Sequence, residues 1–95
     1  MNSLQPSAGE PVVLDAMLDL KAADRLKAEL MERRGLPLEI DASGVQRLGG
    51  LCLQVLIAAH NAWRLDGVSM TISPQSPEFS EALQLFGADA LFPIQ

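Results

Sequence analysis

The order of apolar and polar residues along the chain predicts strands that alternate with helices. Residues 12–16, 36–41 and 68–73 have the β-rich content or the two-residue alternation of short strands. Segments with helical periodicity lie at about 20–34, 50–66 and 77–86. Strands and helices joined by short loops imply a mainly parallel sheet flanked by helices, so the sequence predicts the α/β class.

The first helix is expected to pack on the sheet through a single apolar stripe. The stripe recurs at spacings of three and four and contains Leu20, Ala23, Leu26 and Leu30. Asp19 stands at the N-cap position, and Arg33 and Arg34 are placed in the last turn, where they complement the helix dipole. Gly35 is the expected stop.

The last helix has the clearest start signal in the chain. Ser76 is the expected N-cap and Pro77 takes the first helical position. Gly87 is the expected stop, and the short apolar segment after it is expected to lie against the sheet. The predicted buried stripe of this helix contains Phe79, Leu83 and Phe86.

The middle helix begins near Gly50, runs for about 15 residues and is apolar on most of its circumference. A wide core face is assigned to Leu51, Cys52, Val55, Ala58, Ala59 and Ala62. This assignment leaves over Leu53, Leu56 and Ile57. Apolar residues left outside a core face indicate a contact surface. The alternative is that the C-terminal residues 90–94 cover them.

Composition and charge narrow the class of protein. The 95 residues carry a net charge of −5 and form no basic stripe, so nucleic acid is not an expected partner. Residues 1–10 are polar and are expected to form a flexible tail, and residues 11–95 a single domain. The start resembles no secretion signal and no apolar run reaches the length of a membrane span, so a cytoplasmic protein without membrane insertion is expected.

The sequence contains no convincing catalytic or metal-binding group. Cys52 and His60 lie eight positions apart in one predicted helix, which is about 12 Å along its axis and too far for a nucleophile pair. One Cys and one His are too few for a zinc site. Asp15, Asp41 and Asp66 could gather at one sheet edge, but solvated positions are favoured for each. We therefore expect no enzyme activity, no cofactor and no metal.

The pair Gly49-Gly50 opens the middle helix and has two interpretations. No Lys-Ser or Lys-Thr follows the glycines, so this is not a P-loop. Free N–H groups at a helix start can receive an anion, and glycines allow a partner to approach closely. The alternative is that the pair only makes the turn from strand to helix.

Several stretches, in their order and spacing, make residues 11 to 92 resemble a STAS domain, the fold of the anti-sigma-factor antagonists and of sulfate-transporter tails. The stretch "IDASGV" is similar to the strand end of the family, and "RLGGLCLQVLIAA" to its turn and Leu-rich second helix. The first helix "LDLKAADRLKAEL" and the final "SPQSPEFSEALQLFGADALF" also resemble family elements. The resemblance implies a mainly parallel sheet of four to five strands flanked by helices.

The resemblance also implies where a regulatory phosphate would go, and this chain departs from that pattern. The phosphoacceptor position falls on Gly50, which has no hydroxyl, and the preceding acidic position on Gly49. Ser43 lies seven positions earlier, in the turn after a strand, and is not the equivalent residue. By resemblance, the start and exposed side of the second helix bind a partner. That surface contains Gln46, Arg47, Gly49, Gly50, Leu51, Leu53, Gln54 and Ile57.

The function implied by the resemblance is a non-catalytic signalling adaptor. It would bind and regulate a protein kinase, of the chemotaxis-type histidine kinase or anti-sigma type, without being phosphorylated itself. The alternative is a small STAS subunit that binds the ATPase of a membrane lipid-transport ABC complex. A phosphorylated anti-sigma antagonist is disfavoured because the serine is missing at Gly50. The first two roles would use the same helix surface, so the sequence does not separate them.

Overall fold

The computed structural model describes residues 10–93 and has an α/β fold. Its strands are β1 (Val12–Val13), β2 (Met17–Leu18), β3 (Leu38–Ala42), β4 (Arg47–Leu48) and β5 (Met70–Gln75). Its helices are α1 (Leu20–Met31), α2 (Gly50–Asp66) and α3 (Pro77–Leu85). The predicted flexible tail lies, apart from Glu10, outside the described residues.

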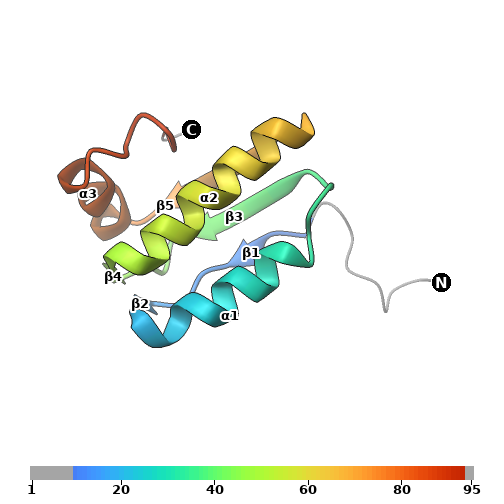
Figure 1. Ribbon diagram of the computed structural model, residues 1–95. Coiled ribbons are helices and arrows are strands. Elements are labelled where there is room, and N and C mark those ends of the chain that lie inside the picture. Colours follow the sequence, from blue (N-terminus) through green and yellow to red (C-terminus); the bar gives the residue numbers. More distant parts are fainter. Residues whose placement is uncertain (1–9, 94–95) are drawn as a thin grey trace.

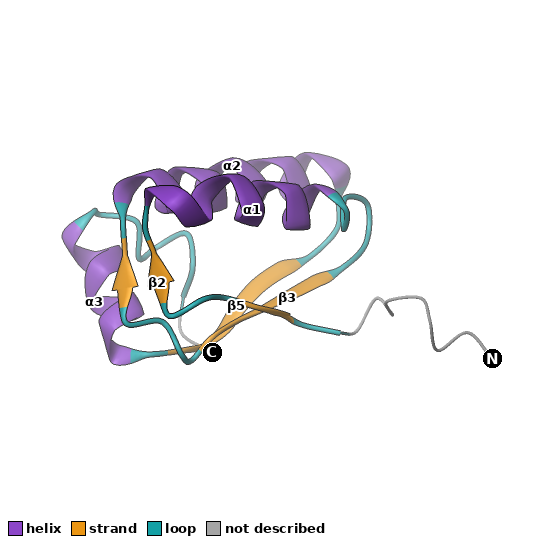
Figure 2. Ribbon diagram, turned by 90° about the horizontal axis from the view of Figure 1, so that it is seen from below, coloured by secondary structure: helices purple, strands orange, loops and turns teal. Residues whose placement is uncertain are grey.

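The strands pair in parallel, as the alternation of strands and helices predicts (Figure 1). The main sheet has the order β1-β3-β5, with Ile40 of β3 opposite Val12 of β1 and Ile72 of β5. Helices α1 and α2 lie side by side across one face of this sheet, and α3 lies at its end (Figure 2). This arrangement is the expected mainly parallel α/β fold.

The described strands form two sheets instead of one sheet of four to five strands. The segment expected as one strand at 12–16 leaves the main sheet after Leu14, whose N–H donates to the carbonyl of Asp41 at 3.0 Å. The chain then pairs again at β2, where Met17 lies opposite Arg47 of β4. The second, two-stranded sheet carries the chain to the starts of both α1 and α2.

Helix α1 begins as predicted and ends earlier than predicted. The Asp19 side chain accepts from the N–H groups of Lys21 and Ala22, which confirms the N-cap. Leu20, expected in the buried stripe, is the first residue of α1 and is 76% exposed, whereas Ala22 is buried. The helix ends at Met31, so the two arginines expected in its last turn, Arg33 and Arg34, lie in the turn that follows.

Helix α3 is tied into the core at its start. The Ser76 hydroxyl is buried, accepts from the N–H of Phe79 and donates to the carbonyl of Val45 at 2.6 Å. The predicted N-cap is therefore confirmed. Phe86 was expected in the buried stripe, but it follows the last helical residue as C-cap and is 52% exposed. Beyond it Phe92 is buried, so the final segment packs on the fold as expected.

The buried face of α2 differs from the one expected. The core residues of this helix are Cys52, Leu53, Leu56, Ala59 and Trp63. Leu51 and Ala58, assigned to the core face, are exposed, while Val55 and Ala62 are half-buried. Leu53 and Leu56, which the prediction left outside the core, are therefore core residues, and Leu51 and Ala58 lie outside it. The proposed cover by the C-terminal segment is not needed for Leu53 and Leu56, and Ile94 lies outside the described residues.

Candidate functional site

The start of α2 lies unusually close to the end of β2. The N–H of Gly49 donates to the carbonyl of Leu18 at 2.9 Å. A Cβ atom at Gly49 would stand only 3.0 Å from that carbonyl oxygen, so a side chain there would force two backbone segments apart. Next to this contact, the Cys52 Sγ atom lies 3.3 Å from the carbonyl of Asp19. The first glycine of the pair therefore has a structural role in docking α2 against the second sheet.

The second glycine is under no such constraint. Gly50 is exposed, and a Cβ there would meet only the Cε1 atom of Phe86, at 4.0 Å. No side chain caps the N-terminus of α2, because the N-cap residue is Gly49. Helix α2 therefore begins with backbone that no side chain caps, next to the half-exposed ring of Phe86. This is the candidate functional site.

The structure gathers most of the predicted partner-binding residues around this helix start. Gln46, Arg47, Gly50, Leu51 and Gln54 are exposed, and Gly49 and Ile57 are half-buried. Leu53 is the exception: it is 4% exposed and packs in the core, so it is removed from the surface. The remaining residues come from the loop before β4, from β4 itself and from the first turns of α2.

Phe86 belongs to the candidate site, and the sequence interpretation missed it. A signal was present, because Leu85 and Phe86 are adjacent apolar residues at the end of a short helix. Neighbouring positions on a helix point about 100° apart, so a narrow buried stripe leaves one of the two outside it. Leu85 is 87% exposed as well. The C-terminal end of α3 thus adds exposed apolar surface next to the start of α2.

A groove between α1 and α2 continues from the candidate site. It has a volume of about 360 Å³ and includes Leu51 and Gln54, which also belong to the predicted binding surface. We call it the α1–α2 groove. Its lining contains Lys27, Leu30, Met31, Arg34, Leu51, Gln54, Val55, Ala58, Ala59, Ala62 and Trp63.

The residues considered for chemistry do not assemble into a reactive site. Cys52 is 1% exposed, and burial raises the pKa of its thiol, which makes it a poor nucleophile. His60 is half-buried and meets the ring of Phe92 edge-on, with centroids 5.5 Å apart. Within residues 10–93 there is no group of three or more His, Cys, Asp or Glu side chains placed to hold a metal ion.

The three aspartates considered together have separate partners. Asp15 pairs with Arg25, and Asp66 pairs with Arg34 at 2.9 Å. Hydrogen bonding from Arg34 lowers the pKa of the Asp66 carboxyl. Asp15, Asp41 and Asp66 therefore do not form one cluster at a sheet edge.

Asp41 and Ser43 form a local turn at the end of β3. The Asp41 carboxylate accepts from the Ser43 hydroxyl at 2.7 Å and from the Ser43 N–H at 2.9 Å. These hydrogen bonds lower the pKa of Asp41. The Ser43 hydroxyl is therefore engaged by the Asp41 side chain. Ser43 is exposed and lies in the turn between β3 and β4.

The geometry of a bare helix start without reactive groups agrees with the comparison against known families. A family model described as "Mlab, STAS domain" matches residues 4–93. This chain belongs to the STAS domain family. Membership carries a protein-interaction role of the kind found in the anti-sigma-factor antagonists. No curated protein matches this STAS chain significantly.

None of the helices of this STAS domain, over the described residues, is long and apolar enough to cross a membrane.

Proposed function

We propose that this STAS protein is a non-catalytic, cytoplasmic adaptor that binds and regulates a protein kinase. The kinase is of the chemotaxis-type histidine kinase or anti-sigma class, and binding uses the N-terminal end of α2 without phosphorylation there. The observation that carries the proposal is the start of α2, where Gly50 is open to solvent beside the half-exposed ring of Phe86. Exposed apolar surface ringed by polar side chains is typical of protein interfaces.

The proposed contact surface combines two elements. Gly50 and Leu51 present backbone and one apolar side chain, and Phe86 adds an aromatic ring of the kind enriched at interfaces. Polar residues surround this centre, namely Gln46, Arg47 and Gln54, and Gly49 and Ile57 complete the surface. An apolar centre with a polar rim favours specific protein binding.

Regulation on this surface would be stoichiometric. A phosphate at the first turn of α2 would add about two negative charges and change the interface. Gly50 has no hydroxyl to carry that phosphate, and Ser43 is held in a turn with Asp41. The partner would therefore be controlled by the amount of this protein, and its release would not require a phosphatase.

The missing hydroxyl also supports a second candidate partner. Without an acceptor at Gly50, the partner does not have to be a kinase. The ATPase of a membrane lipid-transport ABC complex would bind the same surface, with the STAS protein as a structural subunit.

Affinity purification from the native host with tagged protein tests the proposal. Gly50→Arg places a long cation in the surface and should lose the partner, since Gly50 has open space around it and the fold should survive. Leu65→Arg is the matched control: Leu65 lies on the same helix, is 79% exposed, and stands about 22 Å further along the axis. A kinase lost only with Gly50→Arg supports the proposal, an ABC ATPase supports the second candidate, and equal recovery with both variants contradicts both.

A further inference from the structure

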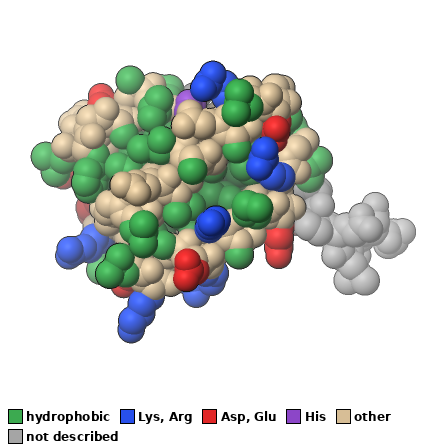
Figure 3. All heavy atoms as spheres, viewed as in Figure 1, with side chains coloured by type: hydrophobic (Ala, Val, Ile, Leu, Met, Phe, Trp, Pro, Cys, Tyr) green, Lys and Arg blue, Asp and Glu red, His purple; other side chains and the backbone are tan. Residues whose placement is uncertain are grey.

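Small side chains of α2 line the α1–α2 groove. Ala58 and Ala62 of α2 line it together with Met31 of α1, and the two alanines fill little of the space between the helices. Trp63 closes its floor and is 2% exposed. Figure 3 shows apolar side chains gathered in this hollow, with Lys and Arg at its edge.

The α2 wall of the groove has the spacing of a helix-packing seam. Leu51, Val55, Ala58 and Ala62 follow one another at steps of four, three and four residues. This alternation is the pattern with which one helix receives the side chains of another. Leu51 is 46% exposed and Ala58 is also exposed, which shows that α1 leaves part of the seam uncovered. The pattern favours a helix as occupant over an irregular or extended segment.

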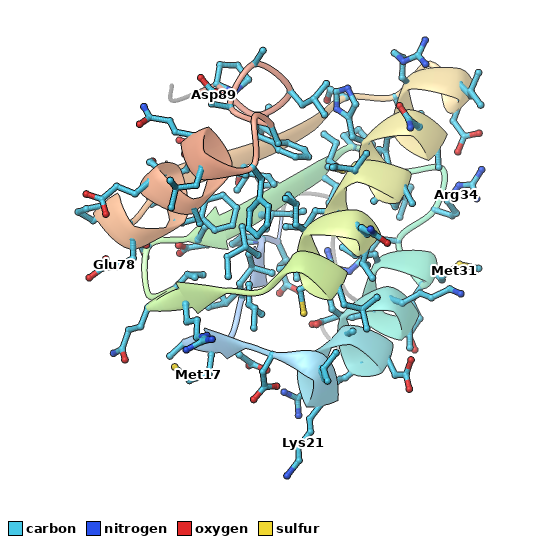
Figure 4. The ribbon with its side chains drawn as sticks, turned by 60° about the vertical axis from the view of Figure 1, so that its left-hand side comes forward. Met17, Lys21, Met31, Arg34, Glu78 and Asp89 are labelled. Carbon is cyan, nitrogen blue, oxygen red and sulfur yellow. The ribbon has the colours of Figure 1, made fainter. Side chains whose placement is uncertain are left out.

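The charged side chains that line the groove are all positive, although the whole protein has a net charge of −5. Lys27 and Arg34 are its only charged lining residues, and no carboxylate lines it. Lys27 makes no ion pair within residues 10–93, whereas Arg34 forms an ion pair with Asp66. Arg34 projects outward with Met31 from the C-terminal end of α1 (Figure 4). Lys27 lies on α1, and Arg34 lies in the turn that follows its last residue, Met31.

We propose that the α1–α2 groove binds an acidic amphipathic helix of the partner protein. The apolar face of that helix would pack on the α2 seam, and acidic residues on its flank would face Lys27 and Arg34. The inference rests on the proposed function, because the groove continues from the start of α2 through Leu51. The partner would thus contact the helix start with one surface and lay a helix along the groove with another.

A peptide titration followed by NMR tests this inference with the full chain. The probe is a synthetic helical peptide of about 18 residues, built from Ala and Gln, with Leu at the same four-three-four spacing and two Glu on its flank. Amide signals of residues 27–34 and 51–62 should shift, and the fluorescence of Trp63, the only Trp, should change. A peptide with Lys in place of both Glu should bind about five- to tenfold more weakly.

Variants separate the groove from the helix start. Ala58→Trp fills the groove and should abolish peptide binding, while Ala28→Trp, on an exposed α1 position outside the lining, should retain it. Gly50→Arg, also outside the lining, should lose the partner but keep the peptide, so the two proposals can fail separately. The inference is overturned if groove signals do not shift at millimolar peptide, if the Glu and Lys peptides bind equally, or if folded Ala58→Trp binds like wild type.

Discussion

The two adjacent glycines at the start of α2 should respond oppositely to the same substitution. In Gly49→Ala the new methyl group would stand 3.0 Å from the carbonyl oxygen of Leu18, so β2 or α2 must move. Overpacking of this kind costs roughly 1–3 kcal/mol, and Ala is also a poorer N-cap than Gly. We expect Gly49→Ala to lower the free energy of unfolding by about 2 kcal/mol. For a domain of this size that lowers Tm by roughly 8–16 °C.

Gly50→Ala is the matched comparison. Its methyl group meets only Phe86, at an ordinary contact distance of 4.0 Å, and Ala has the higher helix propensity. In the first turn of a helix we expect a gain of about 0.5 kcal/mol, or a Tm higher by roughly 2–4 °C.

Urea unfolding followed by Trp63 fluorescence measures both effects. Trp63 is buried and its indole N–H donates to the carbonyl of Leu36 at 2.8 Å, so its emission should report loss of the core. The urea midpoint should move without a change in the slope of the unfolding free energy. A Gly49→Ala protein as stable as wild type, or equal destabilisation by both substitutions, would refute the assignment of a structural role to Gly49 alone.

The helix caps and the turn after β3 give further expected outcomes. Ser76→Ala removes a buried hydroxyl that bonds to Val45 and caps α3, and it should cost about 2 kcal/mol of unfolding free energy in urea titrations. Asp19→Ala removes only an exposed cap and should cost about 1 kcal/mol; a larger loss than for Ser76→Ala would contradict this ranking. Ser43→Ala should raise the pKa of the Asp41 carboxyl, measured by an NMR pH titration, and leave partner binding intact. Since the folded-state pKa of Asp41 is depressed, its contribution to stability is present above the unfolded pKa, about 3.9, and is lost as pH falls through the folded pKa. This acid-side dependence should weaken in Ser43→Ala, and an unchanged pKa or a folded variant that no longer binds would refute the local role of Ser43.

Local signals in the sequence were sufficient for much of the fold. Asp19 and Ser76 are side chains that cap helices through contacts a few residues away, so their roles do not depend on the rest of the fold. Gly67 caps α2 with a φ of +72°, a conformation that favours glycine. The order of the elements then predicted a parallel sheet, which the strand pairing confirms.

The buried face of α2 could not be predicted in the same way. A helix that is apolar on most sides has no single stripe, so its sequence does not determine which side meets the sheet. Leu53 and Leu56 face the core because α2 is fixed at its start, where Gly49 bonds to Leu18. That contact joins two segments about 30 residues apart in sequence. The exposure of Leu51, and with it the α1–α2 groove, follows from this tertiary contact.

The measurement that tests the central claim most directly is the affinity of the purified partner for wild type, Gly50→Arg and Leu65→Arg. The partner is the protein that wild type retains from the host, and titration calorimetry gives each Kd. If the start of α2 is the binding surface, Gly50→Arg should weaken binding by about a hundredfold or more while Leu65→Arg binds like wild type. Equal Kd values for wild type and a folded Gly50→Arg protein would show that the partner binds elsewhere.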